Sequence, residues 1–265
     1  MVRWSRRLRC SALLAAVVLV ASCGPGPGDG DGGGDGDGRS GAVAGELTVV
    51  AASSLTGVLT DLADAFEEDR PEIEVRLSFA ASPTIVAQVQ EGAPADLVAT
   101  ADDLTMEHLI GSGDVHEPRV FARNRLAIAV ERGNPEGIDG LEDLGRSGLV
   151  VVLCDSAVPC GRLADEALTK AGVSLQADSR EQNVKATLGR VELGEADAAI
   201  VYATDTEAST AVDSVAIPAA QNASTALPIA VVRGAGNRAG AEGFVEFLLS
   251  DAGRAILLDA GFLKP

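Results

Sequence analysis

The chain has 265 residues, of which 46% are hydrophobic, and a formal net charge of −18 at pH 7. Its acidity argues against nucleic acid and anionic lipid as partners, because like charges repel. Its length suffices for a substantial core in one large or two modest domains.

The N-terminus has the pattern of a bacterial export signal. Four arginines among the first nine residues precede an apolar run over Leu13–Val20. This predicts a signal peptide over residues 1–22, since the run is too short to span a bilayer. The small residues before Cys23 resemble a lipobox, which predicts lipidation of Cys23 and an extracytoplasmic protein anchored to the bacterial cell membrane. Ordinary cleavage that leaves Cys23 as a free thiol is the alternative.

Residues 23–45 are almost wholly small or acidic, with Gly, Asp and Pro prominent. This composition cannot bury apolar area and predicts a disordered tether. Its aspartates lack the closing glutamate and flanking helices of a calcium loop, so a flexible acidic leash is the favoured interpretation.

From Glu46 onward, strand and helix patterns alternate. Apolar residues of period 3.6 or 2 distinguish the two kinds of segment. Strands are predicted over residues 47–50, 73–79, 95–99, 126–130, 149–154, 198–202 and 228–232. Helices are predicted over residues 55–66, 83–90, 103–110, 161–171, 183–193, 241–249 and 251–260, with Asp102 or Asp103 as the cap of the third.

This alternation predicts an α/β fold with largely parallel sheets flanked by helices. Two lobes joined by crossing strands, Arg123–Val130 and Thr225–Arg233, explain the length better than one sheet does. We expect residues 46–126 plus 226–265 to form the first lobe and residues 127–225 the second. Ligands would bind in the cleft between them.

Two turns carry a serine where a strand enters a helix. Ser54 follows the strand 47–50, and Ser82 follows the strand 73–79. The free N–H groups of a first helical turn and a hydroxyl favour an anion at such a place. Each serine taken alone is better explained as an N-cap, but the pair at neighbouring strand ends favours binding of one shared oxyanion.

A third turn after a strand contains Cys154 and Cys160. In an exported protein the two thiols can form a disulfide, which would order the backbone donors of this loop. A metal pair or two buried thiols are the alternatives. Zinc is disfavoured because no histidine is near in sequence.

Further donors come from the helix that begins near Val184 and from Tyr202, which ends a buried strand. The tyrosine hydroxyl could donate to a ligand or simply pack in the core with a backbone partner.

No catalytic arrangement is evident, so we predict that the protein is not an enzyme. His108, expected on a helix, and His116, expected in a turn, have no nucleophile partner. No nucleophile elbow, phosphate loop or dinucleotide glycine pattern is present.

Several blocks of the chain match one family in order. They are Ala51-Ala52-Ser53-Ser54-Leu55, Phe79-Ala80-Ala81-Ser82-Pro83-Thr84, Gly92-Ala93-Pro94-Ala95-Asp96, Val158-Pro159-Cys160-Gly161, Asn183-Val184-Lys185, and Gly194-Glu195-Ala196-Asp197 through Ile200-Val201-Tyr202. With these blocks the sequence resembles the periplasmic molybdate-binding proteins of ABC transporters, which have the two-lobed type II periplasmic-binding-protein fold.

The resemblance implies a monomeric receptor that carries molybdate or tungstate to a membrane permease, without a cofactor and without a bare metal ion. It places ligand contacts on the hydroxyls of Ser54, Ser82 and Tyr202 and on the N–H groups of Ser54, Ser82, Cys160 and Val184. Pro83 departs from the family pattern and removes one N–H donor beside Ser82.

Neutral donors can hold a dianion in a dry cleft even in an acidic protein. Such a site disfavours phosphate, which keeps a proton near neutral pH and needs an acceptor. The alternatives are another tetrahedral oxyanion, such as sulfate or thiosulfate, or a secreted α/β hydrolase.

Overall fold

The computed structural model describes residues 44–265. The predicted signal peptide (residues 1–22), the lipidation site Cys23 and nearly all of the predicted tether (residues 23–45) lie outside the described residues. The first strand begins at Gly45, where the tether was expected to end.

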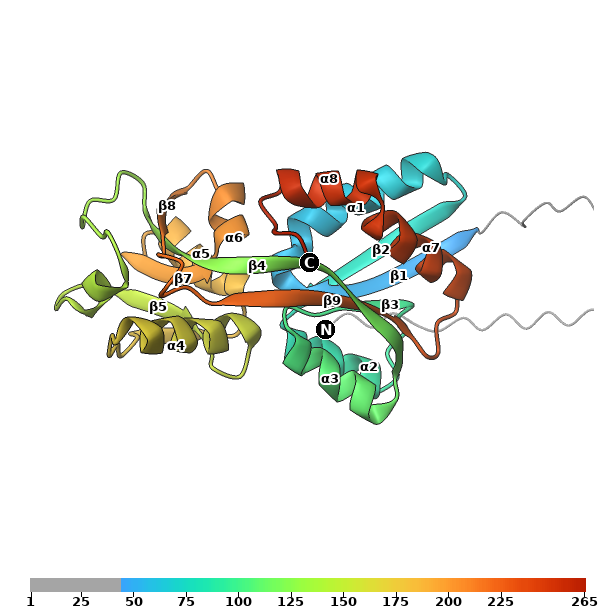
Figure 1. Ribbon diagram of the computed structural model, residues 1–265, viewed down its shortest axis with the longest axis horizontal. Helices are drawn as coiled ribbons and strands as arrows, with labels where there is room; N and C mark the ends of the chain where they lie inside the picture. The colour runs from blue at the N-terminus through green and yellow to red at the C-terminus, as the bar shows by residue number, and fades with distance from the viewer. Residues whose placement is uncertain (1–43) are drawn as a thin grey trace, which may run out of the picture. The chain divides into compact units, whose positions relative to one another are not determined.

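Strands and helices alternate along most of the described chain (Figure 1). The strands are β1 (Gly45–Ala52), β2 (Ile73–Ala80), β3 (Leu97–Ala99), β4 (Val115–Glu131), β5 (Val151–Cys154), β6 (Ser179–Glu181), β7 (Ala198–Tyr202), β8 (Val212–Ala216) and β9 (Ser224–Val232). The helices are α1 (Thr56–Asp69), α2 (Ser82–Gln90), α3 (Asp103–Ser112), α4 (Pro159–Ala171), α5 (Val184–Glu192), α6 (Ala203–Ala208), α7 (Arg238–Leu249) and α8 (Asp251–Asp259), with 3₁₀ turns η1 (Ser53–Leu55) and η2 (Leu141–Gly145).

The strands form one mixed sheet in the order β2-β1-β3-β9-β4-β7-β5-β6, with β8 paired to β4. In the first lobe β2, β1 and β3 are parallel, and in the second lobe β6, β5 and β7 are parallel. Every pairing made by β4 and β9 is antiparallel. The predicted α/β class is therefore confirmed, and the parallel strands are those that precede the candidate site.

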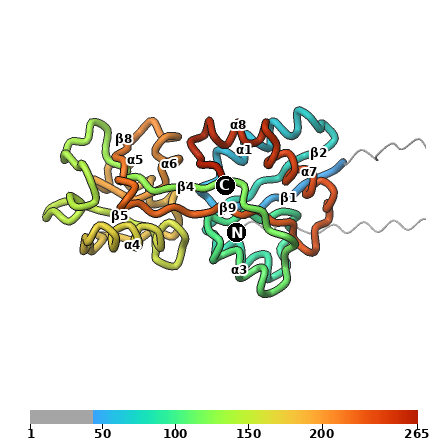
Figure 2. The backbone as a smooth tube through the Cα atoms, viewed as in Figure 1, coloured from blue at the N-terminus to red at the C-terminus, as the bar shows by residue number. Residues whose placement is uncertain are grey.

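β4 and β9 run side by side from one lobe into the other (Figure 2). Their paired segment includes Asn124 opposite Thr225. The expected crossing strands, Arg123–Val130 and Thr225–Arg233, lie in these two elements except for Arg233, which follows β9. Because both strands pass between the lobes, the lobes are joined by two connections that lie side by side.

Helices cover both faces of the parallel strands. Around β2-β1-β3, α1, α7 and α8 lie on one side and α2 and α3 on the other; in the second lobe α4 lies opposite α5 and α6 (Figure 1). α1 shows why: its apolar residues share a face, and Phe66 on that face packs edge-on against Phe244 of α7 with ring centroids 5.1 Å apart.

Helix boundaries follow ordinary capping chemistry. Asp102 caps α3 by accepting a bond from Thr105 N at 2.9 Å, as one of the two predicted caps. α3 ends before Gly113 at φ 76°, and α8 ends near Gly261 at φ 82°, both in the left-handed region that favours glycine.

Several elements were missed. β6, α6 and β8 were not predicted, because each is short and carries polar residues. The strand expected over residues 126–130 is the second half of β4, so the expectation that His116 lies in a turn is wrong: it pairs with Val231. Exposed charged residues recur through the first half of β4, and they concealed the strand pattern there. No helix in residues 44–265 is both long and apolar enough to cross a membrane.

Candidate functional site

A small cavity lies where the two lobes meet. The cavity has a volume of about 20 Å³, little more than one water molecule needs. Its lining comes from six separate segments of the chain: Ala52, Ser53, Ala80, Ala81, Ser82, Ala101, Val158, Pro159, Cys160, Asn183, Val184 and Tyr202. None of these side chains is charged, so the cavity presents hydroxyl, amide and apolar groups alone.

The first lobe contributes the two serine turns. Neither serine is an N-cap, so the capping interpretation is wrong: Ala81 precedes α2, Ala52 precedes η1, and neither helix has a side-chain cap. Ser82 is 2% exposed, and its Oγ accepts a bond from Ala101 N at 3.1 Å. This leaves the hydroxyl hydrogen free to donate into the cavity.

Ser54 is placed differently from Ser82. Its neighbour Ser53 lines the cavity, whereas Ser54 lines an adjoining hollow together with Lys185 and Asp205. Ser54 Oγ is buried and has no hydrogen-bond partner among the described residues. An unpartnered buried hydroxyl costs free energy, which makes this atom a candidate for a ligand contact.

The second lobe contributes the cysteine loop. Cys154 ends β5 and Cys160 lies in the first turn of α4, and a disulfide joins them. Thr187 of α5 donates to Cys154 Sγ at 3.2 Å, which ties the disulfide to a second helix at the site. Gly161 is required here, because a Cβ would lie 2.0 Å from the carbonyl oxygen of Asp155. The loop is thus held closely. In the first turn of α4, Pro159 has no N–H and Gly161 N donates to Val158 O at 3.1 Å, so Cys160 N–H is the donor left for the cavity.

Val184 is the first residue of α5, and Asn183 caps that helix by accepting from Ala186 N at 2.9 Å. The cap takes one N–H of the first turn and leaves others without an intrahelical partner. The N-termini of α4 and α5 both border the cavity, and their dipoles favour negative charge there.

Tyr202 ends β7 and is 1% exposed. Its hydroxyl has no partner among the described residues, which disagrees with packing in the core with a satisfied hydroxyl. Burial, and then the carboxylates of Asp102 and Asp205, raise the pKa of Tyr202 well above its usual value. The phenol therefore stays protonated and is a donor at any physiological pH.

Two cations flank the cavity without lining it. Arg162 of α4 pairs with Asp102 of the first lobe at 2.5 Å and donates to Thr105 Oγ1 at 3.1 Å. Lys185 Nζ lies 2.8 Å from Asp205 Oδ1, an ion-pair distance without the alignment of a hydrogen bond. Burial raises the pKa of Asp205, and Lys185 opposes that effect.

Sequence reasoning assigned no site role to Arg162, Asp102 or Asp205. Asp102 was considered only as a helix cap, and Arg162 is 60 positions from its partner. No local pattern signals such a pair.

Of the residues predicted to contact a ligand, Ser82, Cys160, Val184 and Tyr202 line this one cavity, and Ser54 lies beside it. Within residues 44–265, no group of His, Cys, Asp and Glu side chains is placed to hold a metal ion.

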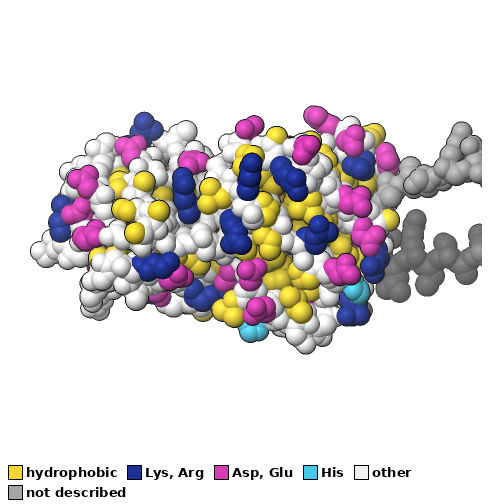
Figure 3. Space-filling model, viewed as in Figure 1, with side chains coloured by type: hydrophobic (Ala, Val, Ile, Leu, Met, Phe, Trp, Pro, Cys, Tyr) yellow, Lys and Arg dark blue, Asp and Glu magenta, His cyan; other side chains and the backbone are white. Residues whose placement is uncertain are grey.

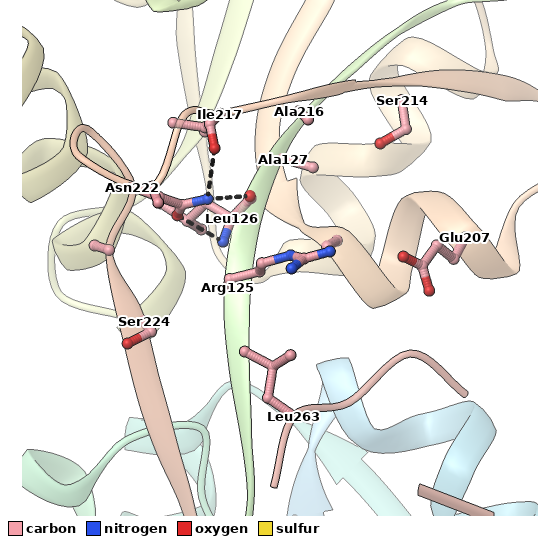
Figure 4. A pocket seen from close by; sticks show the side chains of 13 residues that line it. Arg125, Leu126, Ala127, Glu207, Ser214, Ala216, Ile217, Asn222, Ser224 and Leu263 are labelled. Carbon is pink, nitrogen blue, oxygen red and sulfur yellow. Dashed lines mark hydrogen bonds between the residues drawn. The ribbon is translucent and has the colours of Figure 1, made fainter. Parts of the chain in front are cut away.

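A larger groove of about 540 Å³ lies elsewhere, along β4 and the segment that leads into β9 (Figure 4). Arg125 and Glu207 reach into it from opposite sides. It gathers no set of convergent donors, so size alone does not make it the anion site.

The chain resembles known proteins along most of its length. Residues 47–263 match the family model described as bacterial extracellular solute-binding protein. The molybdate-binding protein ModA of Mycobacterium tuberculosis is 35% identical over 84% of this chain and 86% of the relative.

Two solved structures show the same fold. The periplasmic molybdate-binding protein of Azotobacter vinelandii superimposes with a TM-score of 0.74 at 22% identity, covering 83% of this chain and 99% of that one. The sulfate-binding protein SubI of Mycobacterium tuberculosis gives a TM-score of 0.70 at 22% identity, covering 82% and 86%. The family match and the identity to a curated relative together show that this chain belongs to the bacterial extracellular solute-binding proteins.

Proposed function

We propose that the protein captures molybdate, and tungstate with it, and delivers the anion to the membrane permease of an ABC transporter. The observation that carries this proposal is the small uncharged cavity lined by the buried, unpartnered hydroxyl of Tyr202, with the equally unpartnered hydroxyl of Ser54 beside it. A relative 35% identical to this chain is named a molybdate-binding protein, which supports the choice of ligand.

The proposed contacts are the hydroxyls of Ser54, Ser82 and Tyr202 and the N–H groups of Ser54, Ser82, Cys160 and Val184. Each group is a hydrogen-bond donor, and charge-assisted bonds to an oxyanion are the strong kind. Pro83 follows Ser82 directly and has no N–H, so the first turn of α2 offers one donor fewer.

A donor-only cavity selects for a fully ionised ligand. Phosphate carries a proton near neutral pH, and no carboxylate lines the cavity to accept it. Sulfate is fully ionised but smaller than molybdate, so its bonds in a cavity of fixed size would be stretched.

Calorimetric titration of the purified protein with molybdate, tungstate, sulfate and phosphate tests the proposal. We expect tight binding of the first two and weak or no binding of the others. Preferential binding of sulfate or thiosulfate would instead support the second candidate, for which the fold likeness to a sulfate-binding protein is the reason.

We assign residues 46–126 plus 226–265 to the first lobe and residues 127–225 to the second. Closure of these lobes around the anion is the proposed motion, with ligand favouring the closed state through contacts from both. Scattering measurements with and without molybdate would show a more compact protein when the anion is bound.

The proposed location is the outer face of the bacterial cell membrane, with the protein held as a monomer by a lipid on Cys23. Mass spectrometry of the mature N-terminus and release of a Cys23→Ala variant from membranes test the anchor. We propose no catalytic activity, and a screen of ester and phosphate-ester substrates would contradict this if turnover were found.

A further inference from the structure

The described part of this acidic protein concentrates most of its unpaired cations around its C-terminal segment. Most of its Lys and Arg side chains form ion pairs or donate to backbone carbonyls. Those with neither kind of partner among residues 44–265 are all exposed: Arg119, Arg123, Arg125, Arg254 and Lys264. We call this set the basic face.

The fold brings Arg123, Arg125, Arg254 and Lys264 together from two distant parts of the sequence, and Leu263 lies next to all four. Arg119, Arg123 and Arg125 are exposed positions of β4, while Arg254 is on α8. Arg123 and Leu263 exchange two backbone hydrogen bonds of 2.9 Å, which places Lys264 beside β4. Figure 3 shows Lys and Arg side chains gathered over β4 and the C-terminal segment on the viewed side.

Apolar surface adjoins these cations. Arg254 and Lys264 line a hollow of about 370 Å³ whose other walls include Phe121, Leu257 and Leu258. Leu258 is 44% exposed, one of the few large apolar side chains of the described residues to be so open. Asp251 lines this hollow but forms no ion pair with the basic face. Glu207 lines the larger groove that Arg125 also lines, and it too forms no ion pair with the basic face (Figure 4).

We propose that the basic face docks on a membrane surface that contains anionic phospholipid. Exposed cations combined with exposed apolar side chains are the chemistry of interfacial membrane binding, in which phosphates meet Lys and Arg and apolar groups enter the boundary region. Unpaired cations suit this role, because no internal partner must be given up.

The overall charge of −18 predicts repulsion from anionic lipid, but charge distribution reverses this locally. At physiological ionic strength charges are screened beyond about 8 Å, so a membrane at contact with the basic face feels mainly that face. The acidic remainder would then orient the protein, since turning any other face to the membrane is repulsive.

Docking leaves the anion cavity untouched. No residue of the basic face lines that cavity, so membrane binding and anion binding can be measured separately. A variant that loses membrane binding but keeps anion binding would therefore assign membrane binding to the basic face.

The test uses the full chain carrying Cys23→Ser, so that lipidation does not contribute. Its binding to vesicles of phosphatidylcholine alone is compared with binding to vesicles that also contain phosphatidylglycerol. A variant combining Arg119→Ser, Arg123→Ser and Arg125→Ser removes part of the basic face. At about 1 kcal/mol per cation near an anionic surface, we expect on the order of a hundredfold loss of binding to the mixed vesicles.

The matched control combines Arg76→Ser, Arg190→Ser and Arg238→Ser, which removes the same charge from side chains that are paired with carboxylates. We expect it to bind mixed vesicles like the parent, and both variants to keep the molybdate-induced thermal shift that reports the fold. Equal loss in the two variants, or no preference of the parent for phosphatidylglycerol, would overturn the proposal. If the variant of Arg119, Arg123 and Arg125 impaired transport in cells but bound vesicles like the parent, the proposal would also be overturned, and a protein partner would be indicated instead.

Discussion

Asp102 and Arg162 form an ion pair between the start of α3 in the first lobe and α4 in the second, with Oδ2 and Nη2 2.5 Å apart. The other carboxylate oxygen of Asp102 caps α3 through Thr105 N. One side chain therefore stabilises a helix within its own lobe and joins the two lobes beside the candidate site.

Asp102→Asn keeps an oxygen for the cap and removes the charge that pairs with Arg162. Because the pair joins the two lobes beside the site, we expect its loss to favour an open state and raise the Kd for molybdate about tenfold, mainly through faster release. Stopped-flow dissociation and calorimetry measure this. Glu242→Gln breaks a pair within α7 and should change neither rate, and equal effects of both substitutions would contradict the role of Asp102.

Ser82→Ala removes a hydroxyl that accepts from Ala101 N and is free to donate to the anion. A hydrogen bond to a charged group contributes about 1.5–3 kcal/mol, so we expect a Kd for molybdate roughly tenfold to a hundredfold higher. Calorimetry measures the change. Ser78→Ala, at an exposed position of β2, is the matched control. Unchanged affinity in Ser82→Ala would rule out direct contact.

Tyr202→Phe should lower the affinity for molybdate without lowering the stability of the anion-free protein. The hydroxyl is buried without a described partner, so its removal should leave the anion-free protein as stable as the parent or slightly more stable. Molybdate affinity should nevertheless fall by tenfold or more, since a donor is lost. Thermal unfolding without anion and titration with anion are the two measurements. A clear loss of stability with normal affinity would show that Tyr202 is a core residue only.

Asp205 makes stability depend on pH in a defined direction. Its pKa is raised by burial, so the folded protein binds this proton more tightly than the unfolded chain does. The stability that protonated Asp205 contributes is complete below the unfolded pKa of about 4 and is lost as pH rises through the higher folded pKa.

Asp205→Asn removes this titration. The melting temperature of the variant minus that of the parent should therefore be larger at pH 7 than at pH 4. Thermal melts of both proteins across this range provide the measurement. A difference that stays constant with pH would mean that Asp205 titrates alike in the folded and unfolded states.

Replacing Cys154 and Cys160 by Ala should lower the free energy of unfolding by about 2 kcal/mol, the loop-closure entropy expected for so short a loop. Molybdate affinity should fall as well, because the first turn of α4 loses its tether to β5. Urea unfolding and calorimetry test the two effects separately. Reduction of the parent with dithiothreitol should reproduce both, and affinity that survives both treatments would show that the loop is ordered without the disulfide.

Much of the fold was predictable because apolar periodicity is local information. The face of α1 that includes Leu59 and Phe66, and the buried strand ending at Tyr202, were both evident from spacing. The first half of β4 was not, since Arg119 and Arg123 point to solvent beside an irregular register and disguise a strand. The capping interpretation of Ser54 and Ser82 failed for a related reason: sequence shows that a serine opens a helix but not what its hydroxyl faces.

By itself the sequence determined the alternation of strands and helices, the donor-rich turns at Ser54, Ser82, Cys160 and Val184, and the resemblance that names a ligand class. These depend on residue types at short spacing. Only the tertiary structure decided that Tyr202 is buried with a free hydroxyl, that Arg162 meets Asp102, and that the unpaired arginines of β4 gather beside Lys264. Each of these relationships joins residues far apart in the chain, and burial and charge pairing are properties of the packed protein that no local pattern specifies.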